Sequence, residues 1–376
     1  MSRARVLLVF GTRPEAIKMA PVVTALRARP ERFEARICLT GQHREMLDQV
    51  MAAFALTADV DLDLMRADQS PSGVAAGALA ALAGPLSALA PDVVLVQGDT
   101  ITTFAAAFAA YLQKIRVGHV EAGLRTDDRY RPFPEEMTRR LTTACADYHF
   151  SPTERARANL LREGIPEAAV VVTGNTVVDA LLATVRDDFE FQHSALAALD
   201  FERPTVLVTM HRRESHGAPL AEAAEAIRLV AAARPRVQVV FPVHRNPNVR
   251  GPIERILGGE DRIKLIDPLD YRQFVHLMAR STLALTDSGG IQEEAPSLRL
   301  PVLVLREVTE RPEAVEAGTS RLVGTQRDRI VTETLRLIDD PRERARMTAV
   351  NPYGDGRAAE RIVDALARML PPSGRP

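Results

Sequence analysis

Short runs of Val, Ile and Leu alternate with longer segments of helical periodicity along most of the chain, beginning at Arg5. Apolar runs of about four to eight residues that alternate with helical segments are typical of βαβ units around a parallel sheet. In α/β proteins, ligands bind at the carboxyl ends of the parallel strands. The alternation therefore predicts an α/β fold, with functional residues directly after the apolar runs.

The alternation runs through the chain twice. In the first half we expect strands at 6–10, 36–39, 93–97 and 117–120, and helices at 14–29, 43–54, 72–89, 103–113 and 135–146. After a less regular segment, a second series begins, with strands at 206–209, 237–241, 263–266, 283–285 and 302–305. Two similar α/β domains are implied, with a boundary between about 170 and 203. A final helix at 356–369 could pack on either domain.

The composition is that of a globular protein with sizeable cores. Its 376 residues, of which 46% are hydrophobic, suggest two or three domains. A net charge of −1 provides no overall field for nucleic acid or an anionic membrane, so local groups would have to hold an anionic ligand. Cys38 and Cys145 lack metal-ligand spacing, which favours core thiols in a reducing compartment.

No targeting or membrane segment is evident, so we expect a cytoplasmic protein without membrane insertion. The apolar run after Arg5 is five residues long, which is too short for the core of a signal peptide. No apolar stretch approaches the ~20 residues of a membrane span. The chain has neither a G-x-G-x-x-G fingerprint nor a Walker loop, and we expect no cofactor and no metal ion.

The stretch LALTDSGGIQEEAPSL, which begins at Leu283, predicts a nucleotide-binding corner. A short strand would end before the adjacent glycines Gly289 and Gly290, which permit positive φ and close backbone approach. A helix would follow, with Ser288 or Asp287 as its cap. Free N–H groups at such a helix start attract phosphate.

Charged residues surround this corner. Glu294 could accept hydrogen bonds from ribose hydroxyls, but Glu293 and Glu294 could equally be simple partners of the helix dipole. Arg306 and Arg311 follow the next apolar run. At the carboxyl edge of a sheet, an arginine suggests ligand binding more strongly than it would on a helix face.

A second anion-binding corner follows the first strand, in the sequence FGTRPEAIK. Gly11 permits the turn, Thr12 can cap a helix, and Pro14 suits a helix start. Arg13 and Lys18 add positive charge. For Lys18 a solvated helix position is the simpler interpretation, whereas Arg13 lies in the turn itself, where ligand binding is equally plausible.

Three acids follow or flank the expected strands. Asp99 comes after the run VVLV and Glu121 after VGHV, so each lies at the carboxyl end of a strand. Glu135 begins a helix, with Arg139 one turn later. Capping or dipole stabilisation would explain Asp99 and Glu135. Glu121 is harder to explain structurally, because an acid that ends an apolar strand loses hydration unless it is paired.

His211 and His244 each follow an apolar run of the second series, and each stands beside arginines. A single histidine is more often structural than catalytic. Two in equivalent positions make a functional role for His211 as plausible as a structural one. Phe274 could stack on a base, with core packing as the alternative.

These stretches together resemble one family, the non-hydrolysing UDP-N-acetylglucosamine 2-epimerases. The matching segments run in order along nearly the whole chain, and an ordered set of this kind does not arise by chance. They are FGTRPEAIKMAP, TGQHREML, VQGDTITTFAAAFAA, HVEAGLRT, PFPEEMTRR, HFSPTE, VTGNTVVD, HRRES, PVHRNPNVR, LTDSGGIQEEAPSL, TERPEAVEAGT and NPYGDG.

The resemblance implies the GT-B architecture, with two Rossmann-like parallel-sheet domains and an active site in the interdomain cleft. The domains would span 1–175 and 176–355, the second binding UDP, and a last helix at 356–372 would return to the first. Members are often homodimers. The implied reaction is reversible epimerisation of UDP-N-acetylglucosamine at carbon 2, giving UDP-N-acetylmannosamine for cell-surface polysaccharide.

The resemblance also implies roles for individual residues. Asp99, Glu121 and Glu135 match the family's catalytic acids, and His211 matches the histidine near the diphosphate. The expected substrate-binding residues are Arg13, Lys18, Arg139, Phe274, Ser288, Gly289, Gly290, Glu294 and Arg311. Many bacterial members bind a second UDP-sugar as an activator, at positions that match Gln42, His43, Arg212 and His244. Glu45 and Asp68 replace a Gln and a basic residue found in some of those members.

The chemistry of this reaction accounts for several acids. The carbon-2 hydrogen has no adjacent carbonyl, so direct deprotonation is hard, whereas departure of UDP from carbon 1 makes this hydrogen acidic. One carboxylate would stabilise the charge on the ring and another would take the proton, leaving 2-acetamidoglucal. Protonation from the other face and re-addition of UDP invert carbon 2. Arginines, Lys18, His211 and the helix N-terminus would hold the diphosphate.

Other functions would use a similar nucleotide corner. A GT-B glycosyltransferase would pass the sugar to an acceptor, but no acceptor groove is identifiable in the sequence. An epimerase of a modified UDP-acetamido sugar would share the whole site. The non-hydrolysing motifs argue against an epimerase that releases free N-acetylmannosamine, and a UDP-sugar sensor would not need three acids.

Overall fold

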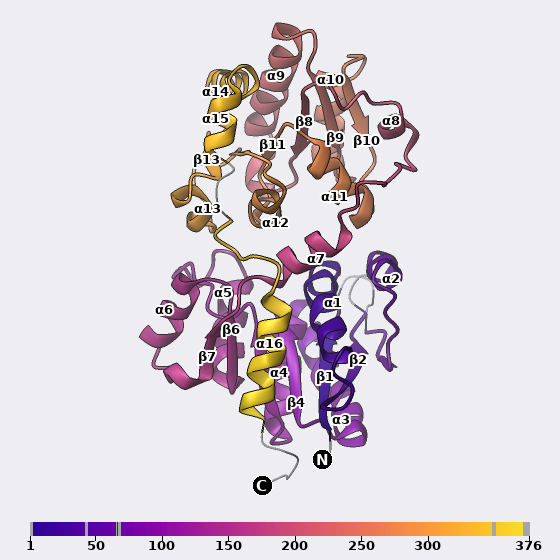
Figure 1. The fold of residues 1–376 in the computed structure, drawn as a ribbon, viewed down its shortest axis with the longest axis vertical. Helices are drawn as coiled ribbons and strands as arrows, with labels where there is room; N and C mark the ends of the chain where they lie inside the picture. The colour runs from indigo at the N-terminus through magenta and orange to yellow at the C-terminus, as the bar shows by residue number, and fades with distance from the viewer. Residues whose placement is uncertain (1–2, 42–43, 65, 67–68, 348–350, 371–376) are drawn as a thin grey trace. The chain divides into compact units, whose positions relative to one another are not determined.

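The computed structural model describes residues 3–41, 44–64, 66, 69–347 and 351–370 (Figure 1). The chain forms two compact units. The first comprises Met1–Ala180 and Tyr353–Pro376, and the second comprises Leu181–Pro352. The second unit is therefore a continuous segment inserted into the first, and each unit is built on its own parallel sheet.

In the described part of the chain, the first unit has a seven-stranded sheet in the order β3-β2-β1-β4-β5-β6-β7, and all neighbouring strands are parallel. The strands are β1 (Ala4–Phe10), β2 (Phe33–Leu39), β3 (Val60–Asp61), β4 (Val93–Gln97), β5 (Arg116–Val120), β6 (Tyr148–Ser151) and β7 (Val170–Val172). The helices are α1 (Arg13–Arg27), α2 (Arg44–Ala53), α3 (Pro71–Leu89), α4 (Ile101–Leu112), α5 (Glu135–Cys145), α6 (Glu154–Arg162), the 3-10 helix η1 (Glu167–Ala169), α7 (Thr176–Thr184) and α16 (Ala358–Met369).

Side chains alternate between the two faces of this sheet, and both faces are apolar. On one face, Leu7 of β1 and Val94 of β4 share a buried core with Leu82 and Leu86 of α3 and with the alanine-rich side of α4. Helices α1 and α16 pack on each other, and Figure 1 shows them along the other face. The first unit is therefore a sheet covered by helices on both sides.

The start of α16 is held by polar groups of the first unit. The carboxylate of Asp179, in α7, accepts hydrogen bonds from the backbone N–H groups of Ala358 (3.1 Å) and Ala359 (2.8 Å). Such unsatisfied N–H groups at a helix start favour a carboxylate. The backbone N–H of Asn175 also donates to the carbonyl of Tyr353 (2.7 Å). These contacts fix the segment that follows the second unit.

In the described residues, the second unit has a six-stranded parallel sheet in the order β10-β9-β8-β11-β12-β13. The strands are β8 (Thr205–Thr209), β9 (Gln238–Pro242), β10 (Ile263–Ile266), β11 (Leu283–Thr286), β12 (Val302–Val304) and β13 (Ser320–Leu322). The helices are α8 (Ser194–Ala197), η2 (Arg213–Ser215), α9 (Ala218–Ala233), α10 (Pro247–Leu257), α11 (Tyr271–Arg280), α12 (Gly289–Glu294), η3 (Ala295–Leu298), α13 (Pro312–Glu316), α14 (Arg327–Asp339) and α15 (Pro341–Arg346).

In each sheet the chain winds outwards in both directions from a central pair of strands, β1 and β4 in the first unit and β8 and β11 in the second. The carboxyl ends of such a pair are where α/β folds bind ligands. β1 ends at Phe10, just before the FGTRPE corner, and β11 ends at Thr286, just before the glycine pair. Both corners predicted from the sequence therefore lie at the carboxyl ends of central strands.

Every strand expected from the sequence overlaps a strand of the structure, but four strands are missing from the expectation. These are β3, β6, β7 and β13. Each has two to four residues, and β6 carries the buried polar side chains His149 and Ser151. Such short strands form through pairing with a neighbour already in place, which a local apolar pattern does not record.

The expectation that no stretch approaches the length of a membrane span is wrong for α3. In the described part of the chain, α3 is the one helix long and apolar enough to cross a membrane by length and composition. Ala78, Leu82 and Leu86 form its buried stripe, spaced by one turn. Most of its other residues are exposed or half-buried alanines and glycines. The buried stripe gives α3 a place in the core of the first unit.

Candidate active site

A buried capping box organises the corner after β1. Thr12 is the N-cap of α1, as the sequence predicts, and its hydroxyl accepts from the backbone N–H of Glu15. The Glu15 carboxylate in return accepts the backbone N–H groups of Gly11 and Thr12, both at 2.8 Å. Arg13 is the first residue of the helix and is half-buried. Glu15 was not among the residues predicted from the sequence, although its place three residues after Thr12 is the capping-box signature.

Glu15 also links two loops of the first unit. Its second carboxylate oxygen accepts hydrogen bonds from the hydroxyls of Thr100 (2.6 Å) and Thr103 (2.9 Å), at the start of α4. Glu15 is only 3% exposed, so these bonds are shielded from water. The corner after β1 is thereby fixed to the loop after β4, which carries Asp99.

Lys18 and Glu121 form a close ion pair. The Lys18 Nζ atom lies 2.8 and 2.7 Å from the two carboxylate oxygens of Glu121, and the side chains are 13% and 5% exposed. The Gln97 amide also donates to Glu121. The interpretation of Lys18 as a solvated helix residue is therefore wrong. Glu121 has the partner that an acid at the end of an apolar strand requires, and it adopts a left-handed backbone conformation with φ 66°.

Asp99 is held by Arg139, which belongs to the start of α5. The Nε and Nη2 atoms of Arg139 donate to one oxygen of Asp99, at 2.9 and 2.6 Å. The Thr138 hydroxyl donates to the backbone carbonyls of Asp99 and Glu135. Asp99 therefore does not cap α4, a role that belongs to Thr100. The sequence placed Arg139 near Glu135, whereas its charge partners are Asp99 and Glu136.

A buried histidine supports the turn before Asp99. His119 has no exposed surface, and its Nε2 lies 2.7 Å from the carbonyl oxygen of Gly98. Because a carbonyl only accepts, Nε2 carries the proton. Burial lowers the pKa of His119 to about 3, an effect that outweighs the hydrogen bond to Gly98. The ring is thus a neutral donor that fixes Gly98.

Glu135 differs from the other two acids in its surroundings. It is the first residue of α5 and is half-buried. In the described structure its Oε2 atom is buried and has no hydrogen-bond partner. The next residue, Glu136, is fully buried and was not singled out by the sequence analysis.

In the second unit, Asp287 organises the loop after β8. It is fully buried and accepts the backbone N–H groups of His211 and Arg212, both at 3.0 Å, and the Ser215 hydroxyl at 3.1 Å. The N-cap position of α12 belongs to Ser288, whose side chain makes no capping hydrogen bond. Of the two residues predicted as the cap, Ser288 therefore holds the N-cap position, and Asp287 is used across the sheet.

His211 lies at the carboxyl end of β8, in contact with Asp287. Its Nδ1 is 3.4 Å from an Asp287 oxygen, and its ring centroid is 6.0 Å from that of His244. Although 44% of the side-chain surface is exposed, desolvation lowers the pKa of His211, while Asp287 acts in the opposite direction. A neutral imidazole is therefore favoured near neutral pH.

An arginine cluster lies beside Gly289. Arg212 donates to the Glu310 carboxylate, and Arg306 lies 2.5 Å from its other oxygen. Burial raises the pKa of Glu310, but Arg212, Arg311 and Arg306 together lower it to about 2. A Cβ atom at Gly289 would lie 3.3 Å from Glu310 and 3.5 Å from Arg212. A side chain there would crowd this cluster.

Arg311 pairs with Glu293, which is 1% exposed. Glu293 is therefore an ion-pair partner rather than a simple dipole residue. Glu294 is 8% exposed, and Phe274 is half-buried in α11. His244 is exposed at the end of β9, and its Nδ1 accepts from the backbone N–H of Asn246 (3.2 Å).

The predicted residues fall into two groups, one in each unit. The first unit brings together Lys18 with Glu121 and Asp99 with Arg139. The second brings His211 and Arg212 to Asp287. Gln42 and His43 of the predicted activator site lie outside the described residues, as does Asp68. Among the described residues, no three His, Cys, Asp or Glu side chains are grouped as metal ligands.

The family model described as UDP-N-acetylglucosamine 2-epimerase matches residues 24–367. The chain belongs to this family. It is 54% identical over 370 residues to the UDP-N-acetylglucosamine 2-epimerase of Escherichia coli strain K12, with 96% of this chain and 98% of that relative covered. It is also similar to a solved UDP-GlcNAc 2-epimerase from Neisseria meningitidis bound to UDP-GlcNAc, with 47% identity, 97% and 100% of the two chains covered and a TM-score of 0.90. The family is one of isomerases.

The GT-B class of fold predicted from the sequence agrees with a more distant structure. The glycotransferase of kitacinnamycin is 13% identical, covers 99% of this chain and all of its own, and has a TM-score of 0.66. At this identity the likeness concerns the fold alone. The fold is thus shared by epimerases and at least one sugar transferase, and the choice between these activities depends on the residues at the strand ends.

Proposed function

We propose that the protein interconverts UDP-N-acetylglucosamine and UDP-N-acetylmannosamine by inverting carbon 2 of the sugar. Membership of the epimerase family supports this activity. The structural observation that carries the proposal is the set of acids in the first unit. Gln97 at the end of β4 pairs in register with Val120 at the end of β5, so Asp99 and Glu121 follow adjacent strands. Thr138 ties the helix of Glu135 to Asp99.

The reaction proceeds by elimination and re-addition in this proposal. The bond between carbon 1 and the diphosphate oxygen breaks, its electron pair leaves with UDP, and a carboxylate takes the carbon-2 proton. The products are 2-acetamidoglucal and UDP. A proton then reaches carbon 2 from the opposite face, and UDP adds back to carbon 1. Atoms and electrons balance without an external oxidant.

The surroundings of the acids suggest how they divide this work. Asp99 and Glu121 are oriented by ion pairs with Arg139 and Lys18, and we assign to them the stabilisation of positive charge on the ring and the acceptance of the proton. We assign proton donation to Glu135. Unlike the carboxylates of Asp99 and Glu121, which contact Arg139 and Lys18, its buried Oε2 atom has no hydrogen-bond partner in the described structure.

The second unit holds the leaving UDP in this proposal. The backbone at Gly289 and Gly290, together with Arg311 and His211, offers positive charge and N–H donors to a diphosphate. The Neisseria meningitidis relative is described as bound to UDP-GlcNAc, which supports a UDP-sugar as the ligand of this family. Phe274 and Glu294 are proposed to contact the uracil and the ribose.

We further propose a homodimer in the cytoplasm. The outer side of α3 is built from small residues, and the adjoining end of α4 exposes Tyr111 and Leu112, at 58% and 62%. An apolar surface of this kind favours contact with a second copy. For a dimer, light scattering should give about twice the chain mass of 41.2 kDa.

The cytoplasmic location is supported by Cys38 and Cys145, which are both free thiols, as expected in a reducing compartment.

The experiment is incubation with UDP-N-acetylglucosamine in deuterated water, followed by proton NMR. The proposal predicts loss of the carbon-2 proton signal and the appearance of UDP-N-acetylmannosamine labelled with deuterium at carbon 2. Binding without exchange would indicate a UDP-sugar sensor and would end the proposal. Consumption of the substrate only when an acceptor sugar is added would indicate a glycosyltransferase.

A modified UDP-acetamido sugar is the second candidate substrate, because the same acids and diphosphate groups would serve it. The two candidates differ in the rate of exchange. If a UDP-acetamido uronic acid exchanged its carbon-2 proton at least tenfold faster than UDP-N-acetylglucosamine, the substrate assignment would be wrong but the mechanism would stand.

A further inference from the structure

We propose that Glu136 is a positioning residue, which orients Arg139 on Asp99 and fixes the loop between Glu121 and Glu135. This inference rests on the proposed function, since it concerns the acids assigned to catalysis. Glu136 has no exposed surface, although it immediately follows the half-buried Glu135. A buried carboxylate must be fully paired to be tolerated, and its partners show what it holds in place.

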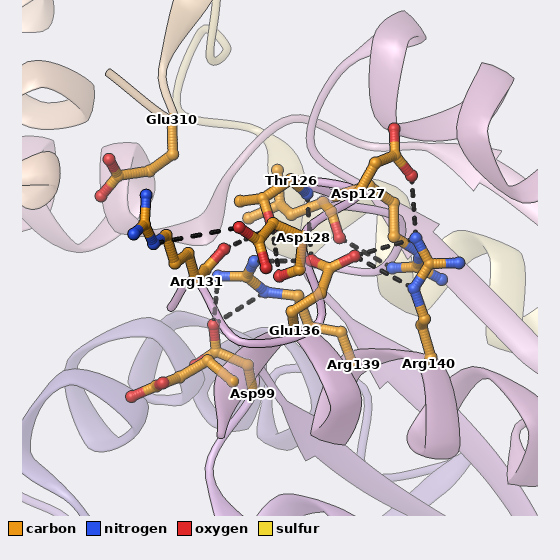
Figure 2. A network of polar contacts seen from close by, with 12 residues as sticks. Asp99, Thr126, Asp127, Asp128, Arg131, Glu136, Arg139, Arg140 and Glu310 are labelled. Atoms are coloured by element: carbon orange, nitrogen blue, oxygen red, sulfur yellow. Dashed lines mark hydrogen bonds and ion pairs between the residues drawn. The ribbon is translucent and has the colours of Figure 1, made fainter. Parts of the chain in front are cut away.

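Each oxygen of Glu136 has its own partners (Figure 2). One oxygen accepts the backbone N–H of Thr126 at 3.0 Å and lies 3.4 Å from Nη1 of Arg139. The other oxygen accepts Nε of Arg140 at 3.0 Å and lies 2.9 Å from its Nη2. Glu136 therefore connects two arginines and a loop backbone.

The contact with Arg139 determines how this arginine meets Asp99. A guanidinium group is planar, and its donors point in fixed directions. Arg139 uses Nε and Nη2 for Asp99 and Nη1 for Glu136. Both carboxylates lie in contact with one rigid group, as Figure 2 shows. Loss of the Glu136 charge would free the plane to rotate and would move the Asp99 carboxylate.

The contact with Thr126 acts on the loop that links the other two acids. This loop begins at Glu121, after β5, and ends at Glu135, where α5 starts. The Thr126 hydroxyl donates to the carbonyl of Arg131 at 2.5 Å, so its backbone position is transmitted along the loop. Glu136 is thus connected to all three proposed acids.

Arg140 has other partners that do not depend on Glu136. Its Nη2 lies 2.8 Å from Asp127, and its Nη1 lies 3.2 Å from Glu163. Glu163 in turn pairs with Arg125 at 2.7 Å. Glu163 shares Arg140 with Glu136, but in the described structure it forms no ion pair with Arg139. Because Glu163 also contacts this loop, through Arg125, it is a matched control for the contact with Arg139, which only Glu136 of the two makes.

The test compares Glu136→Gln with Glu163→Gln. The amide keeps one acceptor oxygen, but its NH₂ group would face an N–H donor of Thr126 or of an arginine. We expect kcat for Glu136→Gln to fall by about 10–100-fold with KM changed less than about threefold, because the substrate groups of the second unit are intact. We expect kcat for Glu163→Gln to stay within about twofold of the wild type.

Solvent deuterium incorporation at carbon 2 provides a readout that a merely structural role would not change. Misplaced acids should lower exchange and net epimerisation in parallel, in a folded protein whose thermal unfolding midpoint lies close to that of Glu163→Gln. If Glu136→Gln does not fold, Arg139→Lys replaces it, since lysine can pair with Asp99 but cannot reach both carboxylates in one plane. We expect the same loss of kcat at nearly constant KM.

The possible outcomes distinguish the positioning role of Glu136 from the proposed epimerase function. Equal kcat in Glu136→Gln and Glu163→Gln, with Asp99→Asn inactive, would overturn the positioning role and leave the proposed function intact. A rise in KM as large as the fall in kcat would also overturn it, because the residue would then act on binding. A wild-type protein that neither exchanges the carbon-2 proton nor forms UDP-N-acetylmannosamine would remove the proposed function and this inference with it.

Discussion

The two units share a strand order around their central strands but use opposite charges at the carboxyl ends. In the first unit the acids Asp99 and Glu121 follow the ends of the strands, and each is paired with a cation, Arg139 or Lys18. In the second unit the buried partner is an acid, Asp287 or Glu293, and it holds a histidine backbone or an arginine. In the function proposed above, the same fold supplies acids for acid–base chemistry in one unit and an anion-binding site in the other.

This difference shows that the partner of a charged residue indicates the role of that residue as clearly as its own type does. An acid fixed by a cation stays ionised and correctly oriented while it awaits a substrate. An arginine fixed by a buried acid keeps its fork directed outwards, towards a phosphate. If the division of labour is correct, variants of the first unit should change kcat, and variants of the second should change KM.

The largest effect is expected for Glu121→Gln. The amide cannot accept a proton or stabilise positive charge, so we expect kcat to fall by about 10²–10⁴-fold with UDP affinity changed little. Steady-state kinetics and calorimetric titration with UDP measure the two quantities. The comparison between the units breaks if the loss appears in UDP affinity while kcat is retained.

The next effect concerns His119, which contrasts with the more exposed His211. Its folded-state pKa of about 3 lies below its ordinary value of 6.5, so the unfolded chain binds more protons between these pH values. The contribution of His119 to stability is complete above pH 6.5 and is lost as pH falls towards 3. We expect a loss of about 2 kcal/mol between pH 7 and pH 5.

The control for this prediction is His119→Gln, whose amide can donate to Gly98 but does not titrate. Urea unfolding at both pH values, for wild type and variant, isolates the contribution of this histidine. If the free energy of unfolding changed equally with pH in the wild type and in His119→Gln, His119 would not be the titrating group. Its burial would then not distinguish it from the more exposed His211.

A smaller effect is expected for Arg311→Lys. Lysine keeps a cation beside the buried Glu293 but lacks the planar fork that matches a phosphate. We expect KM for the UDP-sugar to rise about tenfold with kcat within about threefold, which corresponds to about 1.4 kcal/mol. Initial-rate kinetics decide the point, and a selective fall in kcat would contradict the anion-binding role of the second unit.

The smallest effect is expected for Asp179→Asn. Asp179 and Asp287 are both buried carboxylates that accept two backbone N–H groups, but Asp179 holds α16 rather than a site loop. The amide can still accept, so we expect a loss of about 1 kcal/mol in stability, with kcat and KM unchanged. Denaturant unfolding measures the first quantity. A loss of activity in the folded variant would remove the distinction between the two aspartates.

The sequence predicts the fold well where the signal is local. The central strands β1 and β4 contain continuous apolar runs, VLLVF and VVLV, and the Thr12 cap follows from the residue type and its position. The missing strands β7 and β13 have three residues each, and their place depends on pairing with β6 and β12. Such pairing is a property of the assembled sheet, and no window of the sequence contains it.

The candidate site shows a similar limit. Position relative to the strands was sufficient to select Asp99, Glu121 and His211. The charge partners were not foreseen, because Lys18 and Glu121 are separated by 103 positions and Asp287 reaches across to β8. Asp287 was expected, as the alternative to Ser288, to cap the helix beside it, which is the nearest use of a carboxylate. Long-range pairing had instead taken both of its oxygens.

The return of α16 to the first unit bears on how the chain is made. Since ribosomes deliver residues in order, Leu181–Pro352 leave the exit tunnel as one uninterrupted piece and can collapse at once. The amino-terminal sheet, by contrast, emerges early, and the side of α1 that receives α16 stays uncovered until α16 itself has emerged. In proteolysis of nascent chains, the second unit should therefore become resistant to the protease before the first unit does.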